Sequence, residues 1–199
     1  MSQIPLLIIS DAPDQPSGLG RIARDLATVF VSMPEVRVAT LGLGMRGSVK
    51  FPWTQYAMTR WPAGDYEYGE LSLPYVWEDW SRGQQGIVLT IQDLSRMLWL
   101  ARPEHVADDA LREWLIAHRS PDPTRDGGFR LWGYFPIDST GPGGQLTTMS
   151  REVLLGYDRI LAYSPWALSI MEYTLGGDEA ARRGATWLPH GLGMEVFRP

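Results

Sequence analysis

The stretch "IPLLIISDAPDQPSGLGRIARDL", residues 4–26, holds the pattern that decides the fold class. Its first seven residues are almost wholly apolar, which predicts a strand buried on both faces at the centre of a sheet. A polar loop follows at 11–17, and Ser17 is a candidate N-cap for the helix that comes next. The apolar side chains after the loop fall on one helical face: Leu19, Ile22, Ala23, Leu26, Phe30 and Met33. A buried strand, a loop and an amphipathic helix together predict an α/β unit.

The rest of the chain alternates between short apolar runs and longer segments of helical period. We expect further strands at residues 36–43, 87–93, 129–138, 159–164 and 185–189. We expect helices at residues 95–101, 107–119, 145–155 and 165–176. This order predicts an α/β fold with a Rossmann-like open, mainly parallel sheet and helices on both faces, in one domain spanning residues 1–199.

Residues 45–85 follow neither period clearly, and we expect short strands and an irregular, partly packed loop there. The segment is rich in tryptophan: Trp53, Trp61, Trp77 and Trp80. Two interpretations of these rings remain open. They fill the core, or some of them present flat faces at the surface to a sugar or a base ring.

Composition and charge argue against several classes of protein. The formal net charge is −5 and no block of basic residues occurs, which argues against nonspecific nucleic-acid binding. The chain has no cysteine, so it has neither a disulfide nor a thiolate metal site, and the three histidines have no metal-site spacing. The apolar run at 4–9 is too short to span a bilayer and lacks the basic flank of a signal peptide. We therefore expect a cytoplasmic protein with no membrane span.

Gly18, Gly20 and Ala23 match the pattern G-x-G-x-x-[GA]. In a nicotinamide-binding fingerprint the first glycine directly follows the strand, and an acidic residue comes about 20 positions later. Here residues 11–17 separate the strand from Gly18, and "ATLGLG" closes the second strand without an acidic residue. The sequence therefore disfavours a nicotinamide site.

Two other interpretations of this loop stay open. It is a purely structural turn, or it lets an anionic or hydroxyl group of a ligand approach the backbone at the start of the helix. Arg21 in the first helical turn then faces an anion, or it is an ordinary exposed side chain. If the loop admits a ligand, we expect a side chain at Gly20 to intrude on the space in front of the helix and to harm binding more than folding.

Polar residues stand where the expected strands end, and ligands of open parallel sheets bind beyond those carboxyl ends. They are Ser10, Asp11, Gln92, Asp93, Asp138, Ser139, Ser164 and His190. The set predicts a polar rim that suits a hydroxyl-rich ligand. Asp and Ser also cap helices, and Ser164 before Pro165 has the pattern of a cap.

Four segments occur in an order that resembles a known family. They are "SDAPDQPSGLGRIARDL" (10–26), "GYFPIDS" (133–139), "DRILAYSPWA" (158–167) and "WLPHGLGMEVFRP" (187–199). Together they resemble the N-terminal half of GT-B-fold glycosyltransferases, in particular the large retaining group often called family 4. The resemblance covers nearly the whole chain, and "PHGLGMEVFRP" is its most specific part.

The resemblance implies site residues and substrates. Asp138 falls near the place where relatives often put a polar residue, frequently histidine, close to the transferred sugar, and it is the catalytic candidate. The residues expected to contact the donor phosphates or the acceptor are Gly18, Leu19, Gly20, Arg21, Asp11, Asp93, Ser164, His190 and Gly191. The donor is expected to be a UDP- or GDP-sugar, with no tightly bound cofactor, and the acceptor a saccharide, lipid, small molecule or modified nucleobase.

The same resemblance implies a second domain. Residues from about 190 resemble the crossing to a C-terminal domain that supplies most of the nucleotide-sugar site, including a pair of glutamates. We therefore expect this chain to be the acceptor-side half of a longer transferase and to be inactive by itself. The alternatives are a stand-alone, non-catalytic interaction module and, less favoured, a nicotinamide-dependent oxidoreductase domain.

Overall fold

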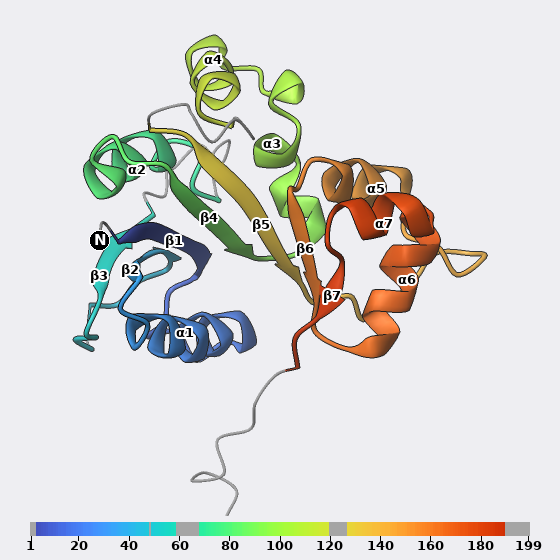
Figure 1. Ribbon diagram of the computed structural model, residues 1–199, viewed down its shortest axis with the longest axis horizontal. Helices are drawn as coiled ribbons and strands as arrows, with labels where there is room; N and C mark the ends of the chain where they lie inside the picture. The colour runs from blue at the N-terminus through green and yellow to red at the C-terminus, as the bar shows by residue number, and fades with distance from the viewer. Residues whose placement is uncertain (1–2, 48, 59–67, 120–126, 190–199) are drawn as a thin grey trace, which may run out of the picture.

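β1 (Ile4–Asp11) is an interior strand, next to the middle strand β4, in a seven-stranded, all-parallel sheet with the strand order β3-β2-β1-β4-β5-β6-β7 (Figure 1). The computed structural model describes residues 3–47, 49–58, 68–119 and 127–189. The other strands are β2 (Val36–Leu43), β3 (Thr54–Ala57), β4 (Gly86–Ile91), β5 (Phe129–Phe135), β6 (Arg159–Ala162) and β7 (Thr186–Trp187). The prediction of an α/β fold with a Rossmann-like open sheet is confirmed.

The neighbours of β1 explain its apolar sequence. It pairs with β2 on one side, from Ile4 opposite Val36 onward, and with β4 on the other, from Leu6 opposite Ile87 onward. Its middle residues are completely buried because side chains pack on both faces of the sheet. The sheet grows in opposite directions from β1 and β4, so their carboxyl ends flank the topological switch point where such folds bind ligands.

The helices follow the sequence pattern with three exceptions. Those of the described residues are α1 (Gly18–Val31), α2 (Leu73–Ser81), α3 (Leu98–Ala101), α4 (Asp109–His118), α5 (Thr148–Leu155), α6 (Pro165–Leu175), α7 (Gly177–Arg182) and the 3-10 helices η1 (Leu94–Met97) and η2 (Pro103–His105). The sequence did not predict α2, α7 or the short 3-10 helix η2. No helix in these described ranges combines the length and the apolar character that crossing a membrane requires.

The expectation of short strands and an irregular loop over 45–85 is wrong for α2. Its apolar residues recur at helical spacing and are buried: Leu73, Val76, Trp77 and Trp80. Pro74 occupies the first turn, where its missing N–H costs nothing, and so favours a helix start. The density of proline and aromatic residues around the segment obscured this period.

The tryptophans of this segment pack in the core. Trp53 and Trp80 are each 8% exposed and Trp77 is fully buried, with its indole N–H donating to the Gly127 carbonyl at 2.7 Å. The core interpretation is therefore confirmed for these three rings, and the surface interpretation is wrong for them. Trp61 lies outside the described residues.

The described helices are divided unequally between the two faces of the sheet. α1 packs on one face, against β1 and β2, and its apolar residues share a cluster with Leu6, Ile8 and Val38. The described helices from α2 to α7, and η1, contribute to the larger cluster on the opposite face (Figure 1). The handedness of the connections explains this, because a right-handed crossover from β1 to β2 and one toward β7 place their helices on opposite faces.

Candidate functional site

The loop between β1 and α1 is fixed by one serine. The Ser17 hydroxyl donates to Asp11 Oδ2 at 2.7 Å and accepts the backbone N–H of Gly20 at 3.0 Å. Ser17 is therefore the N-cap of α1, as the sequence predicts. The N–H of Arg21 also bonds within the turn, to the Ser17 carbonyl at 3.0 Å. Two backbone donors at this helix start are thus already used by the protein.

Gly20 has a structural reason to be glycine. A Cβ there would lie 2.6 Å from the Ala12 carbonyl oxygen and 3.1 Å from that of Gln15, both backbone atoms of the preceding loop. The expectation that a side chain at Gly20 would intrude mainly on ligand space is therefore wrong, because it would first collide with the loop itself. Gly18 differs, since a Cβ there would have nothing within 4 Å. Its backbone is the part of the glycine loop that a ligand can approach.

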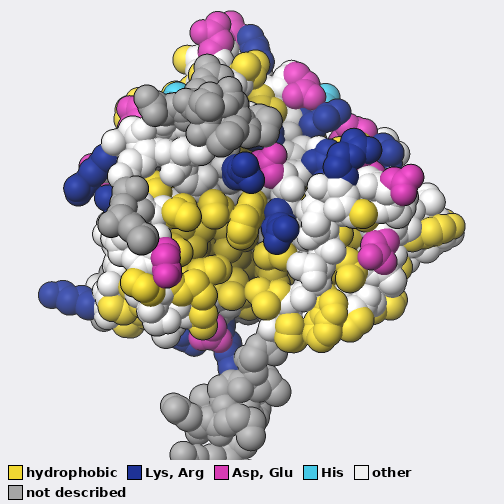
Figure 2. Space-filling view, viewed as in Figure 1, with side chains coloured by type: hydrophobic (Ala, Val, Ile, Leu, Met, Phe, Trp, Pro, Cys, Tyr) yellow, Lys and Arg dark blue, Asp and Glu magenta, His cyan; other side chains and the backbone are white. Residues whose placement is uncertain are grey.

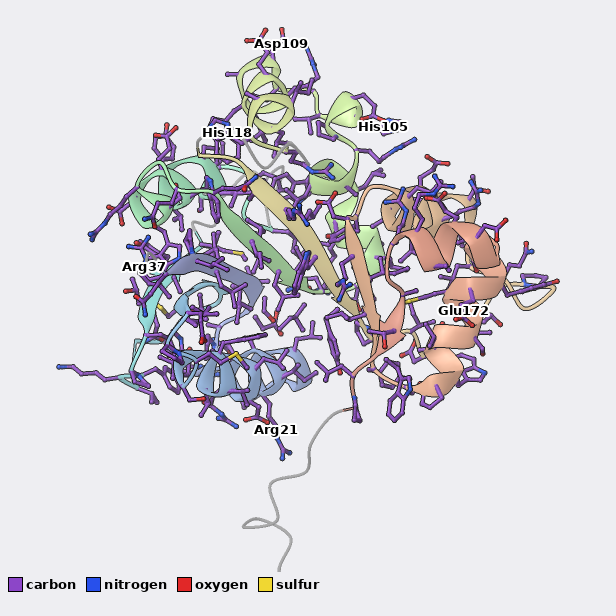
Figure 3. All side chains as sticks on the ribbon, in the orientation of Figure 1. Arg21, Arg37, His105, Asp109, His118 and Glu172 are labelled. Atoms are coloured by element: carbon purple, nitrogen blue, oxygen red, sulfur yellow. The ribbon has the colours of Figure 1, made fainter. Side chains whose placement is uncertain are left out.

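The two remaining residues of the glycine loop serve the fold. The Leu19 carbonyl lies 3.3 Å from the buried Ser10 hydroxyl, and the Leu19 side chain packs into the cluster beneath α1. Arg21 pairs with Asp25 one turn along the helix, at 3.7 Å, and projects from α1 away from the sheet (Figure 3). Its orientation favours the interpretation as an exposed arginine over that as an anion ligand.

A chain of polar side chains links β1 to β4 at the switch point. Gln92, which is 1% exposed, donates to Asp11 Oδ1 at 3.4 Å and accepts from Arg96 Nη1 at 3.2 Å. Arg96 also pairs with Asp93, Nε to Oδ2 at 3.4 Å, and its guanidinium lies 5.0 Å from the centre of the Tyr68 ring. The Arg96 guanidinium therefore pairs directly with Asp93 and is linked to Asp11 through Gln92. The sequence analysis missed Arg96, although its place three residues after a strand-end aspartate was visible.

A hollow of about 350 Å³ opens beyond the carboxyl ends of β4 and β5. It brings together Asp93 and Asp138, which the sequence had placed only at the same edge of the sheet. The rest of its lining is Leu94, Ser95, Phe135, Pro136, Ile137, Ser139, Thr140, Gly141, Leu146, Thr147 and Ser150. Buried apolar side chains and exposed hydroxyls and carboxylates thus share one hollow of the size that small ligands occupy.

The start of α5 forms one wall of this hollow. Thr147 caps the helix, its Oγ1 accepting from the Ser150 N–H at 3.2 Å and lying 2.9 Å from the Ser150 hydroxyl. The positive end of the α5 dipole therefore adjoins the space between Asp93 and Asp138. Sequence reasoning began this helix at residue 145 and so missed both hydroxyls. The Thr-x-x-Ser spacing was the available signal.

The last predicted site residues lie elsewhere or outside the described residues. Ser164 is the N-cap of α6, its hydroxyl accepting from the Ala167 N–H at 3.1 Å, so the cap interpretation is confirmed. It is not part of the lining of the hollow. His190 and Gly191 fall outside the described residues. Within the described ranges, no three His, Asp or Glu side chains are grouped so that they could hold a metal ion.

A buried hydroxyl pair lies beneath the site, inside the larger cluster. The fully buried Tyr157 hydroxyl is 2.8 Å from Thr90 Oγ1, and burial raises the pKa of Tyr157 above its ordinary value. Both residues are sealed from solvent. We therefore assign this pair to the stability of the sheet rather than to ligand binding.

No protein-family model matches this sequence, and no curated protein matches it. The contacts of the hollow, the loop at Gly18 and the resemblance of the ordered motifs are therefore the grounds for a function.

Proposed function

We propose that this domain is the acceptor-side half of a retaining glycosyltransferase and that the hollow holds a sugar-like, polyhydroxylated part of the ligand. The observation that carries this proposal is the meeting of Asp93 and Asp138 in one hollow at the carboxyl edge of the sheet. Carboxylates accept hydrogen bonds from ligand hydroxyls, and charge assistance makes such bonds short and strong. The partly exposed apolar lining from Pro136 and Leu146 suits the C–H faces of a sugar ring.

The proposal gives each group a role. Asp138, exposed on the loop after β5, accepts from the hydroxyl next to the reacting centre. Asp93, oriented by Arg96, fixes the other side of the sugar. The open backbone at Gly18 leaves room for the diphosphate of a UDP- or GDP-sugar, held mostly by a C-terminal domain. Catalysis then consists of positioning and of electrostatic stabilisation of the leaving diphosphate, in a cytoplasmic enzyme.

Ligand binding to the purified domain tests this assignment. Saturation-transfer NMR with mono- and disaccharides, UDP-glucose and GDP-mannose reports which of them bind the domain, and the variants below locate the site. Replacing Asp138 with Asn removes a charged acceptor, and we expect saccharide affinity to fall about tenfold or more with little change in melting temperature, because Asp138 is exposed. Asp178→Asn, on an exposed site of α7, is the matched control and should bind as the wild type does.

Three results would contradict the proposal. They are the absence of any transfer signal from saccharides and sugar nucleotides, equal affinities of the Asp138 and Asp178 variants, and saturable binding of NADH. The last result would support the oxidoreductase alternative.

A further inference from the structure

One face of the sheet is only partly covered by described helices. α1 packs against β1 and β2 and contacts β4, and Leu89, Ile91 and Tyr134 are buried in the cluster beneath it, while the described α-helices after β3 lie on the opposite face. The part of the α1 side without a described helix over it is therefore the amino-terminal portion of β4 and β5 together with β6. In Figure 1 these strands face the viewer without a ribbon in front, and Figure 2 shows apolar side chains gathered over the middle of the same view. All-parallel sheets occur almost only where both faces are covered. An element other than the described helices therefore belongs on this part of the face.

Apolar and basic side chains stand next to each other on neighbouring strands of this surface. Ile87 stands opposite Arg130, and Trp132 stands opposite Arg159 in the sheet register. With Leu161 these residues make up what we call the open face. Its three apolar members are only partly buried, although each contacts the cluster beneath α1. A hollow of about 260 Å³, lined in part by Ile87, Arg130 and Trp132, indents its amino-terminal end.

The open face carries positive charge in an acidic chain. Arg130 and Arg159 are both exposed, and neither forms an ion pair with a described residue. The Arg159 guanidinium lies over the Trp132 ring at 5.5 Å. The nearby Asp158 carboxylate accepts from the Leu131 N–H at 2.7 Å and so has one oxygen already bound. The open face is thus locally positive, although the net charge of the whole chain is −5.

Charge decides between the possible occupants. A second copy stacked on the open face about a two-fold axis would bring the arginines of both copies into one interface, where like charges repel. A helix with acidic residues along one flank would pair with both arginines while its apolar stripe covers Ile87, Trp132 and Leu161. We propose that the open face docks an amphipathic helix of a partner protein, with an apolar stripe and an acidic flank.

Two synthetic helical peptides test the proposal. Both carry the same leucine stripe, and they differ only in having glutamate or lysine along one flank. Fluorescence anisotropy against the intact chain should show the glutamate peptide binding about tenfold or more tightly, with a preference that shrinks as salt rises. The Arg130→Glu, Arg159→Glu double variant should reverse that preference.

A control variant tests whether the effect is specific to the open face, and a folding measurement tests whether each variant is intact. The Arg151→Glu, Arg182→Glu variant makes the same charge change on α5 and α7, on the opposite face, and should leave the preference as in the wild type. Circular dichroism melts show whether each variant is folded. Binding of neither peptide, equal binding of both, or a reversal caused equally by the control variant would overturn the proposal. So would sedimentation of the chain as a dimer that Ile87→Glu dissociates, because a second copy would then cover the face.

Discussion

The Ser17 hydroxyl bonds to the Asp11 carboxylate at 2.7 Å and so joins the first turn of α1 to the end of β1. The same oxygen caps Gly20, so one side chain sets the direction in which the helix leaves the sheet. The position of the Gly18 backbone relative to the switch point depends on this pair.

Ser17→Ala removes both bonds. We expect the free energy of unfolding to fall by about 1–2 kcal/mol, because the cap is lost and one Asp11 oxygen loses its donor. Urea denaturation measures this difference. Ser169→Ala, which removes an exposed hydroxyl bonded within α6, should stay within about 0.5 kcal/mol of the wild type. Equal losses in the two variants would show that Ser17 does not organise the loop.

Gly20→Ala and Gly18→Ala separate packing from ligand access. The added methyl group at Gly20 meets the Ala12 carbonyl at 2.6 Å, and we expect a loss of about 1–3 kcal/mol in unfolding free energy. At Gly18 the methyl group meets nothing within 4 Å, so stability should be unchanged or slightly higher. Chemical denaturation ranks the two. The opposite ranking would mean that the loop is not packed on the helix as described.

Tyr157→Phe leaves the buried Thr90 hydroxyl without its partner. The expected loss of stability at neutral pH is about 1–3 kcal/mol, since a buried polar group becomes unsatisfied. Thr90→Val in the same chain should recover part of the loss, because the orphaned hydroxyl is then gone. Tyr75→Phe, at a side chain that is 77% exposed, is the control.

The pH dependence of stability gives a second test of Tyr157. Burial raises the pKa of its hydroxyl, so the folded state keeps a proton that the unfolded chain loses above pH about 10. This contribution is complete below that pH and declines as the pH rises toward the raised pKa. Above pH about 10, the stability of Tyr157→Phe should therefore fall less steeply with pH than that of the wild type. Some decline remains, because burial first, and then the hydrogen bond to Asp79, raise the pKa of Tyr56 to about 12. Parallel curves for variant and wild type in alkaline urea melts would contradict the assignment.

Arg119 forms hydrogen bonds to the C-terminal ends of α3 and α5. Its guanidinium donates to the Ala101 carbonyl at 2.7 Å and to that of Gly156, and burial lowers its pKa. Arg119→Met should cost about 2–4 kcal/mol, because the donors to two carbonyls are lost. Arg151→Met, on the exposed side of α5, should cost less than about 0.5 kcal/mol by thermal denaturation. If the two variants differed by less than about 0.5 kcal/mol in unfolding free energy, water would be replacing the hydrogen bonds of the arginine.

The spacing of apolar residues predicted the elements whose burial follows a regular pattern along the chain. β1 is buried on both faces and α1 on one, and each has the matching pattern. α2 was missed because proline and aromatic residues around it hid the spacing of its buried face. Strand-end reasoning found Asp93 and Asp138 but could not place Thr147 and Ser150 beside them. The position of these two hydroxyls depends on the path of residues 136–147, which connect β5 to α5. That path is set by tertiary packing, which leaves no periodic pattern in the sequence.

The interior place of β1 in the sheet has a consequence for synthesis. The Ser10 hydroxyl bonds to the Ile91 carbonyl, 81 residues further along the chain. At a translation rate of about 5–20 residues per second, an apolar strand waits on the order of 4–16 s for the strand that completes its pairing. β2 can pair with it earlier, but one edge of β1 stays open until β4 leaves the ribosome. Nascent chains halted before residue 86 should therefore be held by chaperones, and chains long enough to expose β4 should be released.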